Sequence, residues 1–138
     1  MAETKYGKHV MKAPIALEER AQAPLLNFAA GKTCGVNIEW VLAPVFKPIL
    51  MVDKPHNHDF DQFLCFLGSD PTNIEDFGAE IELSLGEEGE KHIITTPTIV
   101  HIPKGLIHCP LNYKRVDKPV FHLDIFLAPE YIRKPKSK

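Results

Sequence analysis

Short apolar runs separated by turn residues make up most of the chain. Val, Ile, Leu and Phe are concentrated in these runs, and twelve prolines and eight glycines punctuate them. Such spacing is typical of an all-β domain with many turns. The pattern predicts strands over residues 36–43, 45–52, 60–67, 79–85, 91–95, 98–102 and 120–127.

The segments between these strands indicate how the chain turns. "GEEGE" (residues 86–90) predicts a hairpin turn, and the polar stretch 69–78 predicts a longer excursion with room for a helical turn. Only "APIALEERA" (residues 13–21) has a helical pattern, and that pattern is weak. Because no internal repeat or linker interrupts the sequence, we expect a single domain.

The predicted strand over residues 60–67 is apolar on both faces. Leu64 and Phe66 share one face, whereas Phe63, Cys65 and Leu67 share the other. A simple antiparallel sheet with one wet face alternates apolar and polar residues instead. The outer face is therefore expected to be covered by another sheet, a terminal arm or a second subunit, and we expect a homodimer.

Composition narrows the class of protein. A chain of 138 residues is long enough for one core, and 44% hydrophobic with 25% charged residues is a globular balance. The net charge of -2 is spread along the chain, and only residues 133–138 form a basic tail, expected to be a solvated end. We expect no nucleic-acid partner, secretory leader or membrane span. Three widely spaced cysteines form no disulfide pattern, which favours the cytoplasm.

Two histidine-containing stretches carry the candidate chemistry. In "HNHDFDQ", His56, His58 and Gln62 share strand parity, so both rings and the amide can converge on one inner face. In "PKGLIHCPLN", a proline and a glycine predict a tight turn at the end of a strand, and His108 follows three residues after Gly105. Either stretch alone is also compatible with a turn that carries a surface histidine.

Together the two stretches resemble the signature motifs of the cupin superfamily. The first motif is H-x-H-x-x-x-E, closed by a glycine, and the second is P-x-G-x-x-H-x-x-x-N. The matching positions are His56, His58, Gln62 and Gly68, then Pro103, Gly105, His108 and Asn112. The sequence departs from the pattern at Gln62, where glutamate is usual, and at Leu50 and Pro97, where each motif usually opens with glycine. The closing Gly68 also comes one residue early.

The resemblance spans residues 36–127 and implies a double-stranded β-helix, the jelly-roll barrel of the cupins. We expect an N-terminal arm over residues 1–35 that packs on the barrel, the barrel over 36–128 and a basic tail over 129–138. The resemblance also implies one divalent transition metal, Fe, Ni, Mn, Co or Zn, with His56, His58, Gln62 and His108 as ligands. Neutral imidazole and amide ligands suit such borderline ions.

The proposed ligands carry no charge, so a divalent ion would keep its full positive charge. That favours a small anionic substrate. His122 and Asp124 share parity on the last predicted strand, opposite to an apolar set that we expect to form core (Phe121, Leu123, Ile125 and Leu127). His122 and Asp124 then face either solvent or a polar cavity, and in a cavity they would serve as catalytic acid or base.

The favoured function is a metal-dependent enzyme acting on a small organic acid, as a dioxygenase, lyase, decarboxylase or isomerase. The alternative is a non-catalytic metal- or small-molecule-binding module. The intact second motif argues against a metal-free cupin of the seed-storage kind. The fold alone does not decide between these functions.

Overall fold

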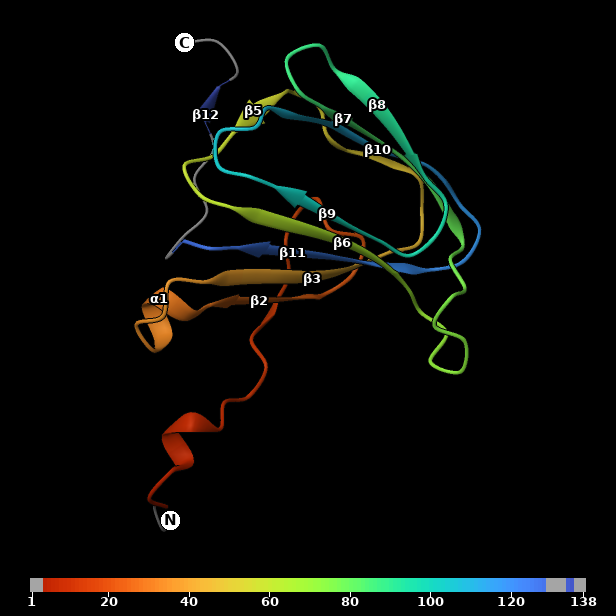
Figure 1. Ribbon diagram of the computed structural model, residues 1–138. Coiled ribbons are helices and arrows are strands. Elements are labelled where there is room, and N and C mark those ends of the chain that lie inside the picture. Colours follow the sequence, from red (N-terminus) through yellow and green to blue (C-terminus); the bar gives the residue numbers. More distant parts are fainter. Residues whose placement is uncertain (1–3, 129–133, 136–138) are drawn as a thin grey trace.

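The computed structural model describes residues 4–128 and the backbone of residues 134–135 (Figure 1). Within these residues, two short helices and twelve strands follow one another, and the core lies between two layers of strands. The helices are the 3-10 turn η1 (Gly7–His9) and α1 (Ala30–Thr33). The strands are β1 (Ile15–Ala16), β2 (Leu25–Ala29), β3 (Glu39–Val45), β4 (Ile49–Val52), β5 (His56–Asn57), β6 (Gln62–Gly68), β7 (Ala79–Leu85), β8 (Glu90–Ile94), β9 (Thr98–Ile102), β10 (His108–Val116), β11 (Val120–Phe126) and β12 (Lys134–Pro135).

The strands form two antiparallel sheets. Sheet A has the order β1-β2-β3-β11-β6-β9. Sheet B has the order β12-β5-β10-β7-β8, with β4 also paired to β10. Non-consecutive strands lie side by side in both sheets, for example β11 between β3 and β6, so the connections cross between the layers. This is the all-β jelly-roll architecture that the sequence predicted.

The strand predictions succeeded where the alternation of apolar residues was strong. They failed where pairing with distant strands, rather than local pattern, determines the strand. β7 and β9 match the predicted ranges 79–85 and 98–102. β10 was missed because Pro110 and the charged pair Lys114 and Arg115 interrupt its pattern, yet it pairs with β4, β5 and β7. The weak helical pattern over residues 13–21 corresponds to no helix, since Ile15–Ala16 instead pairs with β2 as a strand.

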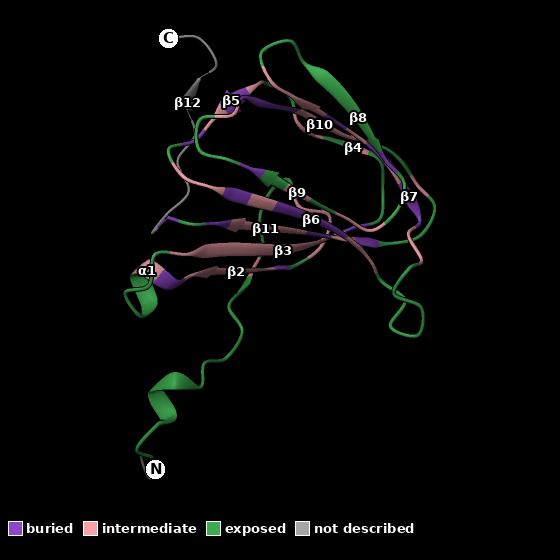
Figure 2. Ribbon diagram, in the orientation of Figure 1, coloured by how far each residue is buried: buried purple, intermediate pink, exposed green. Residues whose placement is uncertain are grey.

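The core fills the space between the sheets, and its side chains come from alternate positions of the central strands (Figure 2). Phe66 of β6, Ile81 and Leu83 of β7 and Tyr113 of β10 are fully buried. On β11 the buried side chains are Val120, His122 and Phe126. The expectation that Phe121, Leu123, Ile125 and Leu127 form the core side of this strand is therefore wrong. That set lies on the other face or, at Leu127, beyond the strand.

The two ends of the chain lie differently with respect to the sheets. Leu25–Ala29 packs as β2 at one side of sheet A, whereas residues 4–14 stand away from the body and are exposed (Figure 1). The expected basic tail over 129–138 lies outside the described residues, apart from Lys134–Pro135, which pairs with β5. Within the described residues, no helix has the length and apolar character to cross a membrane.

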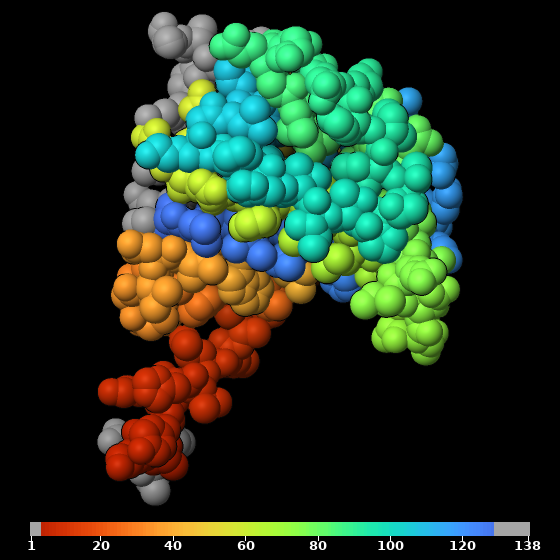
Figure 3. Space-filling view, in the orientation of Figure 1, coloured from red at the N-terminus to blue at the C-terminus, as the bar shows by residue number. Residues whose placement is uncertain are grey.

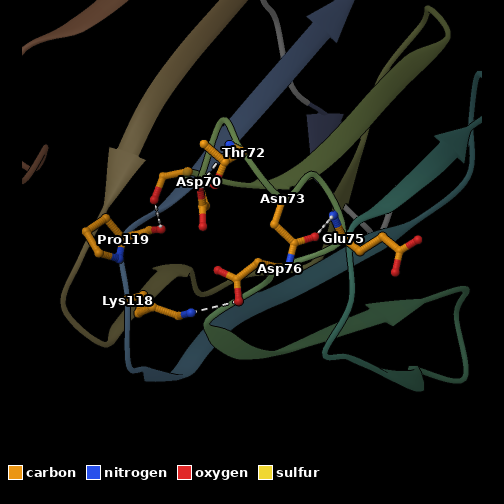
Figure 4. Close-up of polar contacts among 8 residues, drawn as sticks. Asp70, Thr72, Asn73, Glu75, Asp76, Lys118 and Pro119 are labelled. Atoms are coloured by element: carbon orange, nitrogen blue, oxygen red, sulfur yellow. Dashed lines mark hydrogen bonds and ion pairs between the residues drawn. The ribbon is translucent and has the colours of Figure 1, made fainter.

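The polar excursion after β6 is held against the β10–β11 turn. Ser69 Oγ donates to the Pro119 carbonyl at 2.6 Å, and Lys118 Nζ contacts Asp76 Oδ1 at 2.7 Å (Figure 4). At the start of the excursion, a Cβ added to Gly68 would collide with the backbone carbonyl oxygen of Asp76. The glycine that closes the first motif is therefore needed for close approach of two backbone segments.

Candidate functional site

Three histidines come together between the sheets. His56 lies on β5, His58 follows two residues later, and His108 begins β10 directly opposite His56 in the sheet register. Their ring centroids are 4.5 to 5.1 Å apart, and all three side chains are buried. One ligand nitrogen from each ring lies within 4.8 Å of the others. The three rings therefore come together as expected, but strand alternation is not the cause, since β5 ends at Asn57 and His58 lies in the turn that follows.

Backbone carbonyls orient two of these rings. Nδ1 of His56 lies 3.0 Å from the Lys54 carbonyl oxygen, and Nδ1 of His108 lies 2.9 Å from that of Leu106. A carbonyl can only accept, so each Nδ1 carries a proton, and in the neutral ring Nε2 is then the nitrogen whose lone pair could bind a cation. The arrangement selects the ring form that coordinates a cation.

The turn of the second motif is fastened to the first motif. Gly105 has φ +86°, a left-handed conformation that favours glycine, and its N–H donates to the His58 carbonyl oxygen at 2.9 Å. Leu106 N–H donates to the Pro103 carbonyl at 3.0 Å and closes the turn. The Pro-x-Gly spacing therefore places His108 beside the histidine pair through backbone geometry.

Gln62 is buried on the inward face of β6 and is paired with Asp124 of β11. Its Nε2 donates to Asp124 Oδ1 at 2.7 Å. Since a carboxylate only accepts, this bond fixes which end of the amide is nitrogen. The other end, Oε1, is a buried acceptor with no hydrogen-bond partner among the described residues. A cation is the kind of group that would satisfy it, so the donor set fits a metal.

His122 and Asp124 face the interior, and the solvent-facing alternative is excluded. Tyr113 and His122 share a 3.0 Å hydrogen bond between the hydroxyl and Nδ1, and His122 Nε2 lies 3.8 Å from Asp124 Oδ2. The nearby carboxylate favours a proton on Nε2, which makes Nδ1 the acceptor of the tyrosine hydroxyl. Burial, with the charge of Asp124, raises the pKa of Tyr113 far above its ordinary value, so the phenol stays protonated.

A cavity of about 390 Å³ lies beside this polar pair. His122, Asp124 and Phe126 line it, while the three clustered histidines and Gln62 do not. The hydrogen bond between Gln62 and Asp124 is therefore the link between the histidine cluster and the cavity. The Phe60 ring stacks on the His58 ring with 4.7 Å between their centroids. The centroid of the Phe126 ring lies 6.0 Å from that of Phe60, and the two phenylalanines form an apolar wall near the histidine rings.

Sequence reasoning missed the segment that closes the cavity. Glu18, Arg20 and Gln22, which precede β2, line it together with Glu39 of β3. The Gln22 side chain anchors this segment to the β3–β4 turn: its Oε1 accepts from the N–H groups of Phe46 and Lys47 at 2.7 and 2.9 Å. Gln22 and this turn are about 25 residues apart, so no local pattern signals the contact.

Comparison with known proteins is informative at the level of structure. No family model and no curated sequence matches the chain. A deletion mutant of Bacillus subtilis oxalate decarboxylase has a TM-score of 0.54 at 12% identity, over 89% of this chain and 30% of that one. A second structure of the same enzyme, studied for its Mn(II) centres, has a TM-score of 0.54 at 13% identity, over 90% of this chain and 30% of that one. A structure of oxalate oxidase has a TM-score of 0.51 at 10% identity, over 80% of this chain and 53% of that one.

The likeness of these structures confirms the predicted all-β jelly-roll fold. The chain spans about 30% of the oxalate decarboxylase chains and about half of the oxalate oxidase chain. The fold and the site together define a two-sheet jelly-roll β-domain with a buried three-histidine cluster that could hold a metal ion.

The Tyr113 hydroxyl is expected to stabilise the polar pair within the core. Tyr113→Phe removes the partner of His122 Nδ1 and leaves a buried polar atom unsatisfied, so the free energy of unfolding should fall by about 1–3 kcal/mol. Urea denaturation measures this difference. Tyr6→Phe, at an exposed hydroxyl, is the matched control and should change stability little. Equal stabilities for the two variants would contradict the assignment.

Proposed function

We propose that this protein binds one divalent transition metal ion through His56, His58 and His108, with Gln62 Oε1 as the fourth ligand. The buried three-histidine cluster is the observation that carries this proposal. Carbonyl-held Nδ1 atoms on two rings and the buried amide oxygen of Gln62 support it further. Fe, Ni, Mn, Co and Zn all accept such ligands, and the Mn(II) centres of oxalate decarboxylase make manganese the first ion to test.

We propose further that the protein is an enzyme acting on a small anionic organic substrate, of the dicarboxylate or 2-oxo acid class. A bound divalent ion supplies Lewis acidity that polarises a substrate oxygen. The chain supplies the cavity, and the His122 imidazole on its wall takes up or releases a proton. Oxalate, on which the similar enzymes act by name, belongs to this substrate class.

Negative charge lies close to the proposed metal site. The proposed ligands are uncharged, yet Asp124 lies directly behind Gln62 and brings a carboxylate next to the site. Glu18 and Glu39 add negative charge to the cavity wall, where Arg20 is the cation among the lining residues. An anionic substrate is therefore expected to bind at the metal ion and near Arg20 rather than along the whole wall.

We also propose a homodimer in a reducing compartment such as the cytoplasm. The outward-facing side chains of β6 that favoured a second subunit do lie on the outside of sheet A, since Leu64 and Phe66 point into the core. None of the three cysteines, Cys34, Cys65 and Cys109, forms a disulfide in the structure.

His58→Ala is expected to abolish stoichiometric metal binding while the fold is kept, because one imidazole ligand is lost from the cluster. Metal content per chain, measured by mass spectrometry after loading with Mn(II) and gel filtration, reports the result. His92→Ala is the matched control, since His92 is an exposed histidine of β8, and it should bind as much metal as the wild type. Full occupancy in the His58 variant would show that the ligand assignment is wrong.

His122→Gln is expected to slow turnover by about a hundredfold or more while metal content stays unchanged, since a positioned acid or base contributes at least that much. The assay follows product formation by NMR from oxalate and a panel of dicarboxylates and 2-oxo acids with the Mn(II)-loaded protein. If the loaded wild type converts no member of the panel that it binds, the non-catalytic binding module is the better description.

Swapping the amide and the carboxylate of the Gln62–Asp124 pair tests the role of the glutamine. In the double variant Gln62→Glu, Asp124→Asn the hydrogen bond survives with its donor reversed, but the carboxylate moves into ligand position. Mn(II) should then bind at least about tenfold more tightly and oxalate more weakly, because the ion's charge is partly neutralised. Calorimetry with both probes measures this, and Asp124→Asn alone is the control. Equal or tighter oxalate binding by the double variant would show that the glutamine does not set substrate charge.

A further inference from the structure

The cavity beside His122 and Asp124 has walls that are mostly aliphatic. One wall is formed by inward-facing side chains of β3, and another by side chains of β4, which belongs to the other sheet. The aliphatic residues of these two walls are Val41, Ala43, Val45, Ile49, Met51 and Val52. Sites for small molecules are usually lined in this way, with a few polar groups that orient the ligand. The walls therefore predict a ligand with an apolar part.

The polar side chains of the sheet A wall lie beside its aliphatic ones. In the strand register, His122 of β11 lies directly opposite Ala43 of β3, and Asp124 lies directly opposite Val41. Neighbouring strands are about 4.8 Å apart, so the two kinds of side chain are within reach of one small molecule. A ligand that lies across both strands would meet polar groups at one end and hydrocarbon at the other.

The cavity is larger than oxalate requires. An apolar cavity of about 150 Å³ holds benzene, which has six non-hydrogen atoms. On that scale the cavity of this protein, about 390 Å³, has room for roughly fifteen such atoms. Oxalate has as many non-hydrogen atoms as benzene, so it would leave more than half of the cavity unfilled. The size therefore favours a ligand with a substantial body.

Charge in the lining limits the number of acid groups on the ligand. Among the described residues that line the cavity, the carboxylates are those of Glu18, Glu39 and Asp124. The guanidinium is that of Arg20, which is exposed, so that water screens its charge. A second acid group on the ligand would lie among like charges or against hydrocarbon, and both cost free energy. One acid group, satisfied at the proposed metal ion, is favoured.

The segment over residues 17–24 covers the cavity on one side. It follows the projecting arm of residues 4–14 and the short strand β1 (Figure 3). The Gln22 amide holds it to the β3–β4 turn at both ends. Its Nε2 donates to the Lys47 carbonyl at 2.9 Å, and its Oε1 accepts from the N–H groups of Phe46 and Lys47. The attached segment shields that side from water, which makes burial of an apolar ligand part favourable.

We propose that the preferred ligand is a 2-oxo acid with a single carboxylate and an aliphatic or aromatic side chain. Its acid end faces the polar wall of β11, and its side chain lies against the aliphatic walls of β3 and β4. The proposal rests on the proposed function for the chemistry of the acid end, and on the cavity walls for the apolar body. It narrows the substrate class from small organic acids in general to acids with one charge and an apolar side chain.

The first experiment measures by calorimetry how chain length changes affinity for the full-length protein. The series is pyruvate, 2-oxobutyrate, 2-oxopentanoate and 2-oxohexanoate, in which each acid has one methylene group more than the last. The dissociation constant should fall about threefold to fourfold at each step, because each methylene group leaves water. 2-Oxoglutarate, similar in size to 2-oxohexanoate but with a second carboxylate, is the matched control and should bind at least about tenfold more weakly. Equal affinities along the series, or tighter binding of 2-oxoglutarate, overturn the proposal.

The series is measured on both metal-free and Mn(II)-loaded protein, because the aliphatic walls contain none of the proposed metal ligands. The gain with chain length is expected in both forms. If Mn(II) does not bind, or no acid is converted, the proposed function fails, whereas a gain with chain length still supports this inference. If Mn(II) binds and the gain is absent, this inference alone is overturned. Binding of no acid in either form overturns it as well.

Filling the cavity should remove the gain with chain length. Ala43→Phe places a ring opposite His122, and Met51→Trp fills the space from the β4 wall. The gain from pyruvate to 2-oxohexanoate, about thirtyfold or more in the wild type, should fall below about threefold in each folded variant. Leu42→Phe adds a ring on the opposite face of β3 and is the matched control, which should keep the full gain.

Circular dichroism and Mn(II) content establish that each variant is folded. Met51→Trp decides the question if Ala43→Phe does not fold, since its side chain comes from the other sheet. A full gain with chain length in either folded filling variant means that the apolar body lies elsewhere, and it overturns the choice of cavity.

Discussion

Burying a polar side chain between apolar sheets costs free energy unless a partner satisfies it, and this constraint organises the interior of the molecule. Among the described residues, the side chains that are both polar and buried are His56, His58, Gln62, His108 and His122. Every one of them belongs to the candidate site. Packing alone would have filled these positions with apolar residues, as it does around them. Their burial therefore indicates a function that needs polar groups away from water.

Both sheets contribute to the site, which makes it dependent on how they stack. The three clustered histidines come from β5 and β10 of sheet B and from the turn after β5. Gln62, His122 and Asp124 come from neighbouring strands of sheet A. A slip of one residue in β6 or β11 would turn these side chains to the outside and bring apolar ones in. The register of sheet A thus keeps the side chains of the site on its inward face. By the same alternation, it sets which side chains face outward.

The structure also changes the electrostatic description of Gln62. The Gln62 side chain is uncharged, but Asp124 places a carboxylate against the nitrogen end of its amide. The negative charge is thus carried by the side chain that is hydrogen-bonded to Gln62. The carboxylate of Asp124 also orients the Gln62 amide, because Nε2 must face the carboxylate and Oε1 must then point the other way.

The sequence determined those features that depend on local geometry. The close spacing of His56 and His58 marked the histidine pair, and the need for a left-handed residue at Gly105 marked the turn that leads to His108. Strand alternation does not relate this pair to Gln62, because a turn over residues 58–61 carries the chain from β5 of one sheet to β6 of the other. Tertiary structure alone decided which side of β11 faces in, because both sets of its side chains include apolar residues and parity does not say which set the other sheet covers. It also decided that Tyr113 would meet His122 and that Gln62 would meet Asp124, 62 residues away. Such contacts follow from strand register across a sheet, and register is fixed by the packing of the whole chain rather than by neighbours in sequence.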